Sequence, residues 1–337
     1  MLKIKYSKKF DKNKYYEKIS KKKFEVSLCK KDKKGKCVKE KNKIIYLIRK
    51  ELKSIKDFKN KKRVSLLDVF NKFKEIKKDN FHTLFKDISF EELLIGDFKT
   101  LQRIKKRIGT NDAIKENESI KFVFNYTEFR ETYISSFFEN NLTISTCYYC
   151  NIDYINSYNT NKKKKNKFTL DHYYDKSTYP YLALSLYNFV PSCYTCNSKL
   201  KGTEEFTSLS PSSIEFNFEQ KVKFKLYLTD SCKDLNVKSE KNIDIKLKER
   251  YSTEYKKYIE VFKLNERYQA HKDIVFEMIK NAEFYPESRL KELQELTGIP
   301  YQKIKKDIFK LIDDEVDLSK EPFSKLKKDM AFELGLR

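Results

Sequence analysis

The 337-residue sequence has no tryptophan and few glycines, prolines and histidines, with 6, 6 and 3 of these respectively. So little glycine and proline excludes a collagen-like or flexible-linker protein. No apolar run approaches the roughly 18–20 residues that a membrane-spanning helix requires. The first five residues, Met1-Leu2-Lys3-Ile4-Lys5, lead into no apolar segment, so no secretory signal is expected. These absences favour a cytoplasmic protein that contacts no membrane.

Charge is abundant and unevenly distributed. Hydrophobic residues make up 39% of the chain and charged residues 36%, which leaves enough apolar material for a buried core. Of the net charge of +24, residues 1–63 contribute +19 and residues 141–202 contribute +5, whereas the remaining stretches balance. An AT-rich genome would by itself enrich lysine, but drift would spread it evenly. Some of the excess is therefore expected to contact phosphate groups.

Periodicity divides the chain into three regions. We predict a basic strand and helix region over 1–140, an irregular region over 141–205, and a strand pair followed by helices over 206–337. Apolar spacing predicts helices over 44–52, 65–76, 91–108, 128–139, 254–262, 271–282, 287–296 and 304–312. It predicts strands over 24–28 and within 214–228, and a hairpin turn or loop over 30–36. The expected fold class is α+β.

Two cysteine pairs stand in the irregular region, Cys147-Tyr-Tyr-Cys150 and Cys193-Tyr-Thr-Cys196, with 42 residues between them. Each pair can present two sulfurs from a tight turn, and four thiolates form the closed ligand set of a structural zinc site. Thiolates also suit iron–sulfur clusters, and a single such pair can be a redox motif. Because two pairs flank one compact segment, a shared zinc ion is the favoured interpretation. The cysteines that lack such spacing are expected to be ordinary thiols: Cys29, Cys37 and Cys232.

Between the pairs the chain carries an Asp-His dipeptide, Asp171-His172, and then Asn188, and Asn197 directly follows the second pair. Adjacent residues of a strand point to opposite faces, so one can hold a cation while the other addresses a water molecule. The other histidines, His82 and His271, are expected to be structural, and Asp175 is not expected to bind metal. In its order of residues, the stretch from 141 to 205 resembles the HNH endonucleases, in their zinc-stapled ββα-metal form with Asn in the third position.

The resemblance implies a ββα-metal core with a four-cysteine zinc site, embedded between mainly helical regions. It implies His172 as general base, Asp171 and Asn197 as ligands of Mg²⁺ or Mn²⁺, and Asn188 as the residue that holds the loop. Lys176, Lys199 and Lys201 are candidates for phosphate contacts, although a solvated surface lysine is an equally good interpretation of each.

The implied function is metal-dependent hydrolysis of DNA, double-stranded by analogy, in bacterial restriction or antiphage defence. An ATPase or sensor protein is a possible partner that controls cleavage. Two alternatives stay open. A non-catalytic zinc module for binding nucleic acid would need the four cysteines but not Asp171, His172 and Asn197 together. A ribonuclease on the same fold is the other alternative.

Overall fold

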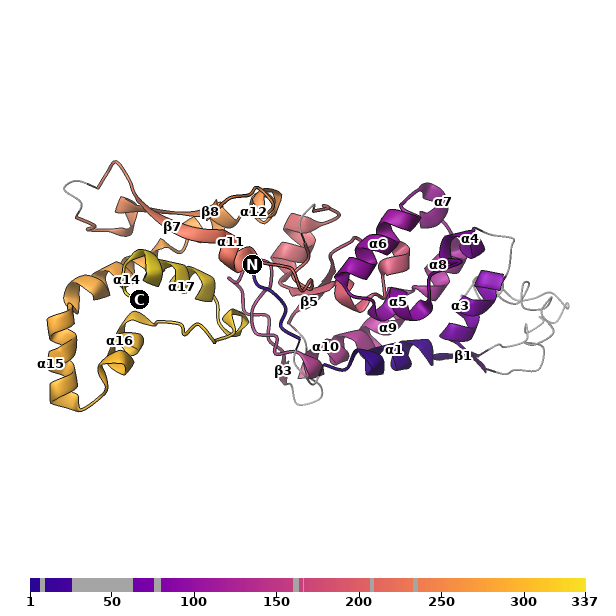
Figure 1. Cartoon of the computed structure of the whole chain (residues 1–337), viewed down its shortest axis with the longest axis horizontal. Coiled ribbons are helices and arrows are strands. Elements are labelled where there is room, and N and C mark those ends of the chain that lie inside the picture. The colour runs from indigo at the N-terminus through magenta and orange to yellow at the C-terminus, as the bar shows by residue number, and fades with distance from the viewer. Residues whose placement is uncertain are drawn as a thin grey trace, which may run out of the picture. The chain divides into compact units, whose positions relative to one another are not determined.

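A computed structural model describes the chain except for residues 7–9, 26–62, 76–79, 160–163, 166, 207–208 and 233–235. The fold is α+β, as predicted, and consists of two compact units (Figure 1). We call residues 6–142 with 172–189 the helical unit, and residues 1–5 with 143–171 and 190–337 the cysteine unit. No helix within the described ranges is long and apolar enough to cross a membrane.

The helical unit is built from short helices around a core of phenylalanine rings. Phe70 contacts the rings of Phe81, Phe85, Phe90 and Phe124, with centroid separations between 4.8 and 6.5 Å. Its strands, β1 and β2, pair antiparallel. The elements are α1 (Lys12–Ser20), β1 (Lys23–Glu25), β2 (Arg63–Ser65), α3 (Leu66–Glu75), α4 (Phe81–Phe85), α5 (Phe90–Ile95), α6 (Phe98–Ile108), α7 (Asp112–Lys115), α8 (Glu118–Val123), α9 (Tyr126–Phe129), η2 (Arg130–Ile134), α10 (Ser135–Asn141), η3 (Pro180–Leu182) and η4 (Leu186–Asn188).

The cysteine unit combines small sheets with the C-terminal helices. Two strands, β5 (Thr169–His172) and β6 (Phe189–Ser192), pair with one another. The division between the two units falls inside each strand, after Asp171 in β5 and after Phe189 in β6. The other elements are β3 (Tyr158–Asn159), β4 (Lys164–Lys165), η5 (Thr195–Lys201), α11 (Phe218–Lys221), β7 (Val222–Leu228), η7 (Glu240–Asn242), β8 (Ile243–Glu249), α12 (Lys256–Val261), α13 (Leu264–Gln269), α14 (Lys272–Phe284), α15 (Glu287–Thr297), α16 (Tyr301–Phe309), η8 (Leu318–Lys320) and α17 (Ser324–Glu333).

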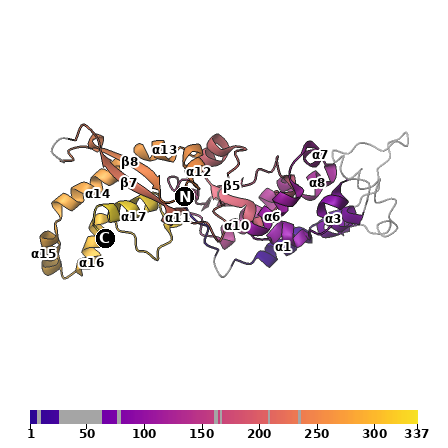
Figure 2. The same cartoon turned by 45° about the horizontal axis from the view of Figure 1, so that its top comes forward.

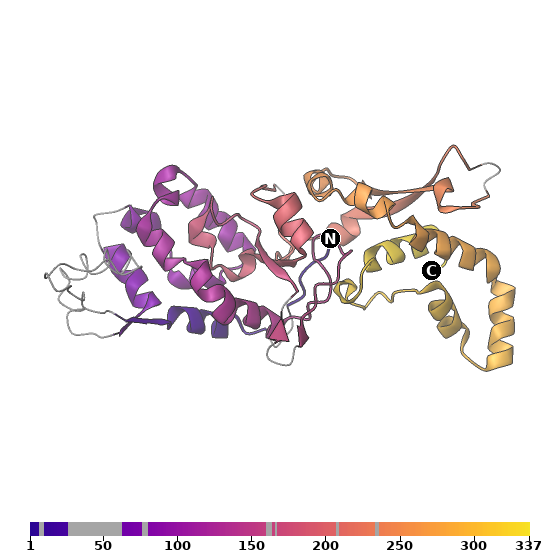
Figure 3. The ribbon, with the colours of Figure 1, turned by 180° about the vertical axis from the view of Figure 1, so that it is seen from behind.

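A long antiparallel ribbon of β7 and β8 organises the C-terminal part of the cysteine unit. Alternate side chains of the ribbon are buried, and Phe224 contacts the ring of Tyr268 on α13 at 4.5 Å. Helix α17 lies along β7, where the Asp329 carboxylate accepts a hydrogen bond from the Phe224 N–H at 2.9 Å (Figure 2). Beyond α14, helices α15 and α16 lie side by side (Figure 3).

Several sequence predictions are confirmed. The helix expected over 65–76 is α3, and Ser65 caps it, since its hydroxyl accepts from the Asp68 N–H at 3.1 Å. Helices are also found close to the ranges predicted in the C-terminal region, as α12, α14, α15 and α16. Strand β1 covers the described part of the strand expected over 24–28. The hairpin over 30–36, the helix over 44–52, Cys29 and Cys37 lie outside the described residues.

Other predictions are wrong in part. The single helix expected over 91–108 is two helices, α5 and α6, because Asp97 caps the second and accepts from the Thr100 N–H at 2.8 Å. The strands expected within 214–228 begin only at Val222. The stretch before it leads into α11, and Phe216, just before this helix, and Phe218, its first residue, pack edge-on against the Tyr255 ring. Tertiary packing of the two rings therefore overrides their strand-like spacing. The helix expected over 128–139 is interrupted by η2, a π-helical turn.

Replacement of Phe70 by alanine is expected to destabilise the helical unit by about 3–5 kcal/mol, because the cavity would open among four phenylalanine rings. Chemical denaturation of the full chain would measure the loss. The control is Phe284→Ala, since that side chain is 61% exposed and its removal should cost little. Equal stability of the two variants would contradict the packing argument.

Candidate metal centre and surrounding residues

The first cysteine pair lies on a tight turn that is closed by Asn151. The Asn151 N–H donates to the Cys147 carbonyl at 2.8 Å, and the Ile152 N–H points at the Cys150 sulfur at 3.4 Å. Asn151 has a φ of 55°, in the left-handed region that asparagine tolerates better than most residues. This backbone reversal brings the two sulfurs to the same side of the turn.

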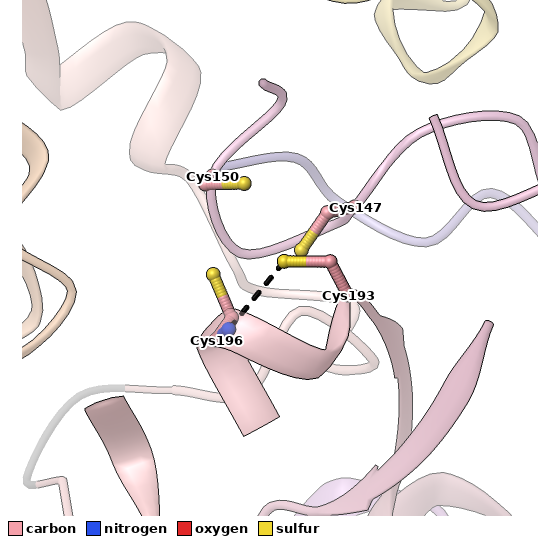
Figure 4. Close-up of side chains that lie close together, drawn as sticks. All are labelled: Cys147, Cys150, Cys193 and Cys196. Atoms are coloured by element: carbon pink, nitrogen blue, oxygen red, sulfur yellow. Dashed lines mark hydrogen bonds between the residues drawn. The ribbon is translucent and has the colours of Figure 1, made fainter. Parts of the chain in front are cut away.

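The second pair lies at the start of η5, directly after β6. The Cys196 N–H donates to the Cys193 sulfur at 3.4 Å, as Figure 4 shows. The four sulfurs converge in the close-up and lie within 4.8 Å of one another, and all four cysteines are buried. Tetrahedral bonds of 2.3 Å to a zinc ion place sulfurs about 3.8 Å apart. The cysteine cluster, Cys147, Cys150, Cys193 and Cys196, could therefore hold a metal ion such as zinc.

Residues around the cysteine cluster supply charge and hydrogen bonds to it. The Arg267 guanidinium on α13 donates to the Cys196 sulfur at 3.3 Å and forms an ion pair with Asp153 at 3.4 Å. The Tyr268 hydroxyl donates to the Cys150 carbonyl at 2.7 Å. Because four thiolates around a divalent ion carry a net charge of −2, a neighbouring guanidinium stabilises the metal-bound form electrostatically.

The Asn151 side chain ties the first cysteine turn to the C-terminal part of the unit. Its amide nitrogen donates to the Glu321 carbonyl at 3.0 Å, and its oxygen accepts from the Ser324 hydroxyl at 3.0 Å and the Lys325 N–H at 3.1 Å. Asn151 is fully buried, so the loss of these bonds would leave several polar groups unsatisfied. Asn151 therefore joins the cysteine turn to the start of α17.

The thiols of the cluster differ in acidity. Burial raises the pKa of Cys147 well above its ordinary value, because the thiolate loses hydration. Burial acts on Cys150 in the same direction, but hydrogen bonds with the other three cysteines and the Arg267 charge outweigh it and hold its pKa well below the ordinary value. A metal ion binds thiolates only, so binding at this cluster must release protons.

Asp171, at the end of β5, lies in a buried polar contact of the cysteine unit. Its Oδ2 accepts from the Tyr149 hydroxyl at 2.6 Å and pairs with the Lys201 ammonium at 3.2 Å. The Lys201 side chain is 0% exposed and that of Asp171 is 4% exposed. Lys201, expected to contact phosphate, is thus placed beside the carboxylate, where its charge compensates that of Asp171.

His172, the next residue, lies in the helical unit. Its Nε2 is 2.9 Å from the Ala183 carbonyl oxygen, and its ring packs edge-on against Tyr126 and Phe189 at 4.5 and 4.9 Å. Since a carbonyl oxygen only accepts, Nε2 must carry the proton of that bond. In the neutral ring the basic nitrogen is then Nδ1. The Ala183 carbonyl therefore selects the tautomer of His172.

Asn188 fastens the loop that follows His172. Its amide nitrogen donates to the carbonyls of Tyr174 and Leu182 at 3.0 and 3.1 Å, and its oxygen accepts from the Tyr174 N–H at 2.8 Å. Further bonds join this loop to the helices of the same unit. The Tyr181 hydroxyl donates to the Gly109 carbonyl at 2.9 Å. The bonds of Asn188 and Tyr181 therefore fix the loop that follows His172.

The remaining candidate residues are closer to solvent. Asn197 on η5 is half-buried, and its N–H donates to the Cys193 carbonyl at 3.0 Å. Lys176 and Lys199 are exposed, with their ammonium groups 5.0 Å from the Tyr126 ring centroid and 5.9 Å from that of Tyr194. Asp175 accepts from the Thr178 N–H at 2.9 Å, which stabilises a local turn.

Comparisons with known proteins add nothing to this geometry: no family model matches the sequence, and neither a curated protein nor a solved structure matches the chain.

Sequence patterns identified the four cysteines but not the residues that support them. Arg267 lies 71 residues from Cys196 along the chain, in a helix whose sequence carries no metal-binding motif. The asparagine that follows Cys150 was a usable signal, because asparagine readily takes the left-handed conformation with which such a turn ends. Tyr149 lies between two ligands, and only the fold directs its hydroxyl to Asp171.

Replacement of Cys193 by serine is expected to abolish stoichiometric zinc binding and to unfold the cysteine unit, since structural zinc contributes roughly 10–16 kcal/mol in small modules. Elemental analysis and thermal melting of the purified protein would measure both effects. Cys232→Ser is the matched control, because that cysteine lies outside the cluster. Wild-type protein isolated without any metal, yet fully folded, would contradict a structural ion.

Replacement of Arg267 by methionine is expected to weaken zinc affinity about 10- to 100-fold, as is typical when a residue that supports metal ligands is lost. Competition with a chromophoric chelator would measure the affinity. Methionine keeps most of the side-chain volume, and thermal melting would verify that the variant is folded. Arg289→Met, at an exposed position on α15, is the control. An affinity equal to that of the wild type would remove Arg267 from the metal centre.

Proposed function

We propose that the chain is a metal-dependent HNH endonuclease that hydrolyses DNA phosphodiester bonds, with a structural zinc ion in the cysteine cluster. One observation carries the proposal. The two cysteine pairs converge on one point, β5 and β6 pair with one another between them, and the helix η5 follows β6 and begins within the second cysteine pair. This order of strand, strand and helix supports the ββα-metal core that the sequence resembles. The zinc ion would hold this scaffold, because a closed set of four thiolates leaves no position for water.

His172 is the general base in this proposal. A base must offer a lone pair to water, and in the neutral ring that donates its Nε2 proton to the Ala183 carbonyl this lone pair belongs to Nδ1. The ring is held by two aromatic contacts and by a loop that Asn188 fastens, which limits its movement during proton transfer. A positioned base of this kind contributes typically 10²- to 10⁴-fold to the rate.

Asp171 and Asn197 would supply the oxygen ligands of a Mg²⁺ or Mn²⁺ ion, which prefers carboxylate and amide oxygens. When bound, such an ion stabilises negative charge on the scissile phosphate. The hydrogen bond from Tyr149 and the ion pair with Lys201 orient the Asp171 carboxylate. Lys201 therefore acts through Asp171 in this proposal, whereas the exposed Lys176 and Lys199 stay candidates for phosphate contacts.

Two other functions use the same features. A non-catalytic zinc module for nucleic acid needs the cysteine cluster alone, and the fixed tautomer of His172 has no role in it. A ribonuclease would use the same groups on a different polymer. Double-stranded DNA as substrate, a role in restriction or antiphage defence, and an ATPase or sensor partner follow from the resemblance only and stay predictions.

His172→Ala is expected to reduce DNA cleavage at least 100-fold while zinc content and melting temperature stay unchanged. The assay would incubate the full chain with plasmid DNA, and in parallel with RNA, in Mg²⁺, in Mn²⁺ or in a chelator. His82→Ala, in the same unit, is the matched control and should cleave like the wild type. Chelator should stop cleavage and added Mg²⁺ or Mn²⁺ should restore it.

Three outcomes would contradict parts of the proposal. Full activity of His172→Ala would remove this residue from the mechanism. Cleavage of RNA alone would favour the ribonuclease. Binding of nucleic acid without cleavage of either polymer would favour the non-catalytic module.

A further inference from the structure

The outer face of the β7–β8 ribbon carries lysines that oppose one another. In the antiparallel register, Lys223 lies opposite Lys248, and Lys225 lies opposite Lys246. Like charges in directly opposed positions destabilise a strand pair. A ribbon that retains two such pairs therefore presents a concentrated positive charge, which an external anion would stabilise.

Acidic residues of α17 neutralise the lysine charges of β7. Lys223 pairs with Asp329 at 3.5 Å, and Lys225 pairs with Glu333. On the other strand, Lys246 and Lys248 are exposed, as is Arg250 directly after β8. These three cations recur at every second position, and such positions along a strand are about 6.8 Å apart. An evenly spaced row of cations suits a polymer of anions better than a single small anion.

Aromatic rings lie beside this row of cations. Tyr227 is 40% exposed, and the ammonium groups of Lys246 and Lys248 lie 5.9 and 6.0 Å from its ring centroid. On α17, Phe332 is 71% exposed. Exposed rings beside cations can stack on the faces of unpaired bases.

A hollow of about 460 Å³ adjoins the ribbon and α17. Phe332 lines it together with the cationic residues Lys223, Lys225, Arg250, Lys328 and Arg337 and the acidic residues Asp314, Asp329 and Glu333. Its volume lies in the range of ligand pockets, roughly 300–1,000 Å³. The hollow thus places an exposed ring among five cationic and three acidic residues, a net positive lining next to the exposed lysines of β8.

We propose that this surface, the outer face of β7–β8 with the adjoining hollow, binds a single-stranded segment of nucleic acid. Phosphates lie along Lys246, Lys248 and Arg250, and bases stack on Tyr227 and Phe332. Single strands expose the base faces that such rings need, whereas the stacked bases of a duplex do not. The inference rests on the proposed function in assigning a nucleic acid as the ligand, and it adds a binding surface built from none of the proposed catalytic residues.

The test measures binding without cleavage. Full-length protein carrying His172→Ala would be titrated against a fluorescent 20-nucleotide single strand and the matching 20-base-pair duplex, over a range of salt concentrations. Lys246→Gln with Lys248→Gln should weaken binding of the single strand. It should also lower the slope of log affinity against log salt by about 1.4, which corresponds to two lost phosphate contacts.

The aromatic residues are tested separately. Tyr227→Leu and Phe332→Leu should each weaken single-strand binding roughly 5- to 150-fold with little change in the salt slope, and Tyr227→Phe should retain binding. Lys256→Gln with Lys303→Gln removes the same charge from exposed positions elsewhere in the cysteine unit and is the control. Thermal melting would verify that each variant is folded.

Each result decides the inference. Unchanged affinity and slope in the ribbon variants, or losses equal to those of the control, overturn it. A duplex that binds more tightly than the single strand, with no effect of Tyr227→Leu or Phe332→Leu, also overturns it in favour of a duplex-backbone site. Because cleavage by the wild type is measured separately, a catalytic enzyme without this surface and a binding surface without catalysis are distinguishable.

Discussion

The convergence of four buried sulfurs is the constraint on which the centre of this protein depends. It joins a turn at residues 147–150 to another at 193–196, and the strands between them must return to the same point. Desolvation opposes ionisation of such thiols, so four thiolates packed this closely are stable only around a cation. The Arg267 guanidinium beside Cys196 and the Asn151 amide network below the first turn are consistent with a centre built to hold charge.

Asp171 and His172 are neighbours in the chain, but their side chains have different surroundings. Consecutive residues of β5 point in opposite directions. The carboxylate lies with Tyr149 and Lys201 in the cysteine unit, and the imidazole lies with Tyr126 and Ala183 in the helical unit. The two groups therefore have separate surroundings: Tyr149 and Lys201 orient the carboxylate, and the Ala183 carbonyl sets the tautomer of the imidazole.

How far the sequence predicts this structure varies with the range of the interactions. Helices such as α3 were predictable because their apolar spacing and the Ser65 cap are local signals. The division of 91–108 into two helices was not predictable from apolar spacing. Gly96 lies at the break, where a Cβ atom would collide with the Glu92 carbonyl oxygen. Strand β8 carries a clear alternation of buried positions that becomes informative only once β7 is known as its partner.

The sequence by itself determined the spacing of the cysteine pairs, the order of the residues between them and the excess of lysine, because these are properties of the chain in one dimension. Only the tertiary structure decided that Lys201 is buried against Asp171, that the Ala183 carbonyl contacts His172, and that lysines of β7 and β8 face one another. The physical reason is that burial and register depend on residues distant in the sequence. The same lysine can be a solvated cation, a buried counter-ion or part of a binding surface, according to what the fold places beside it.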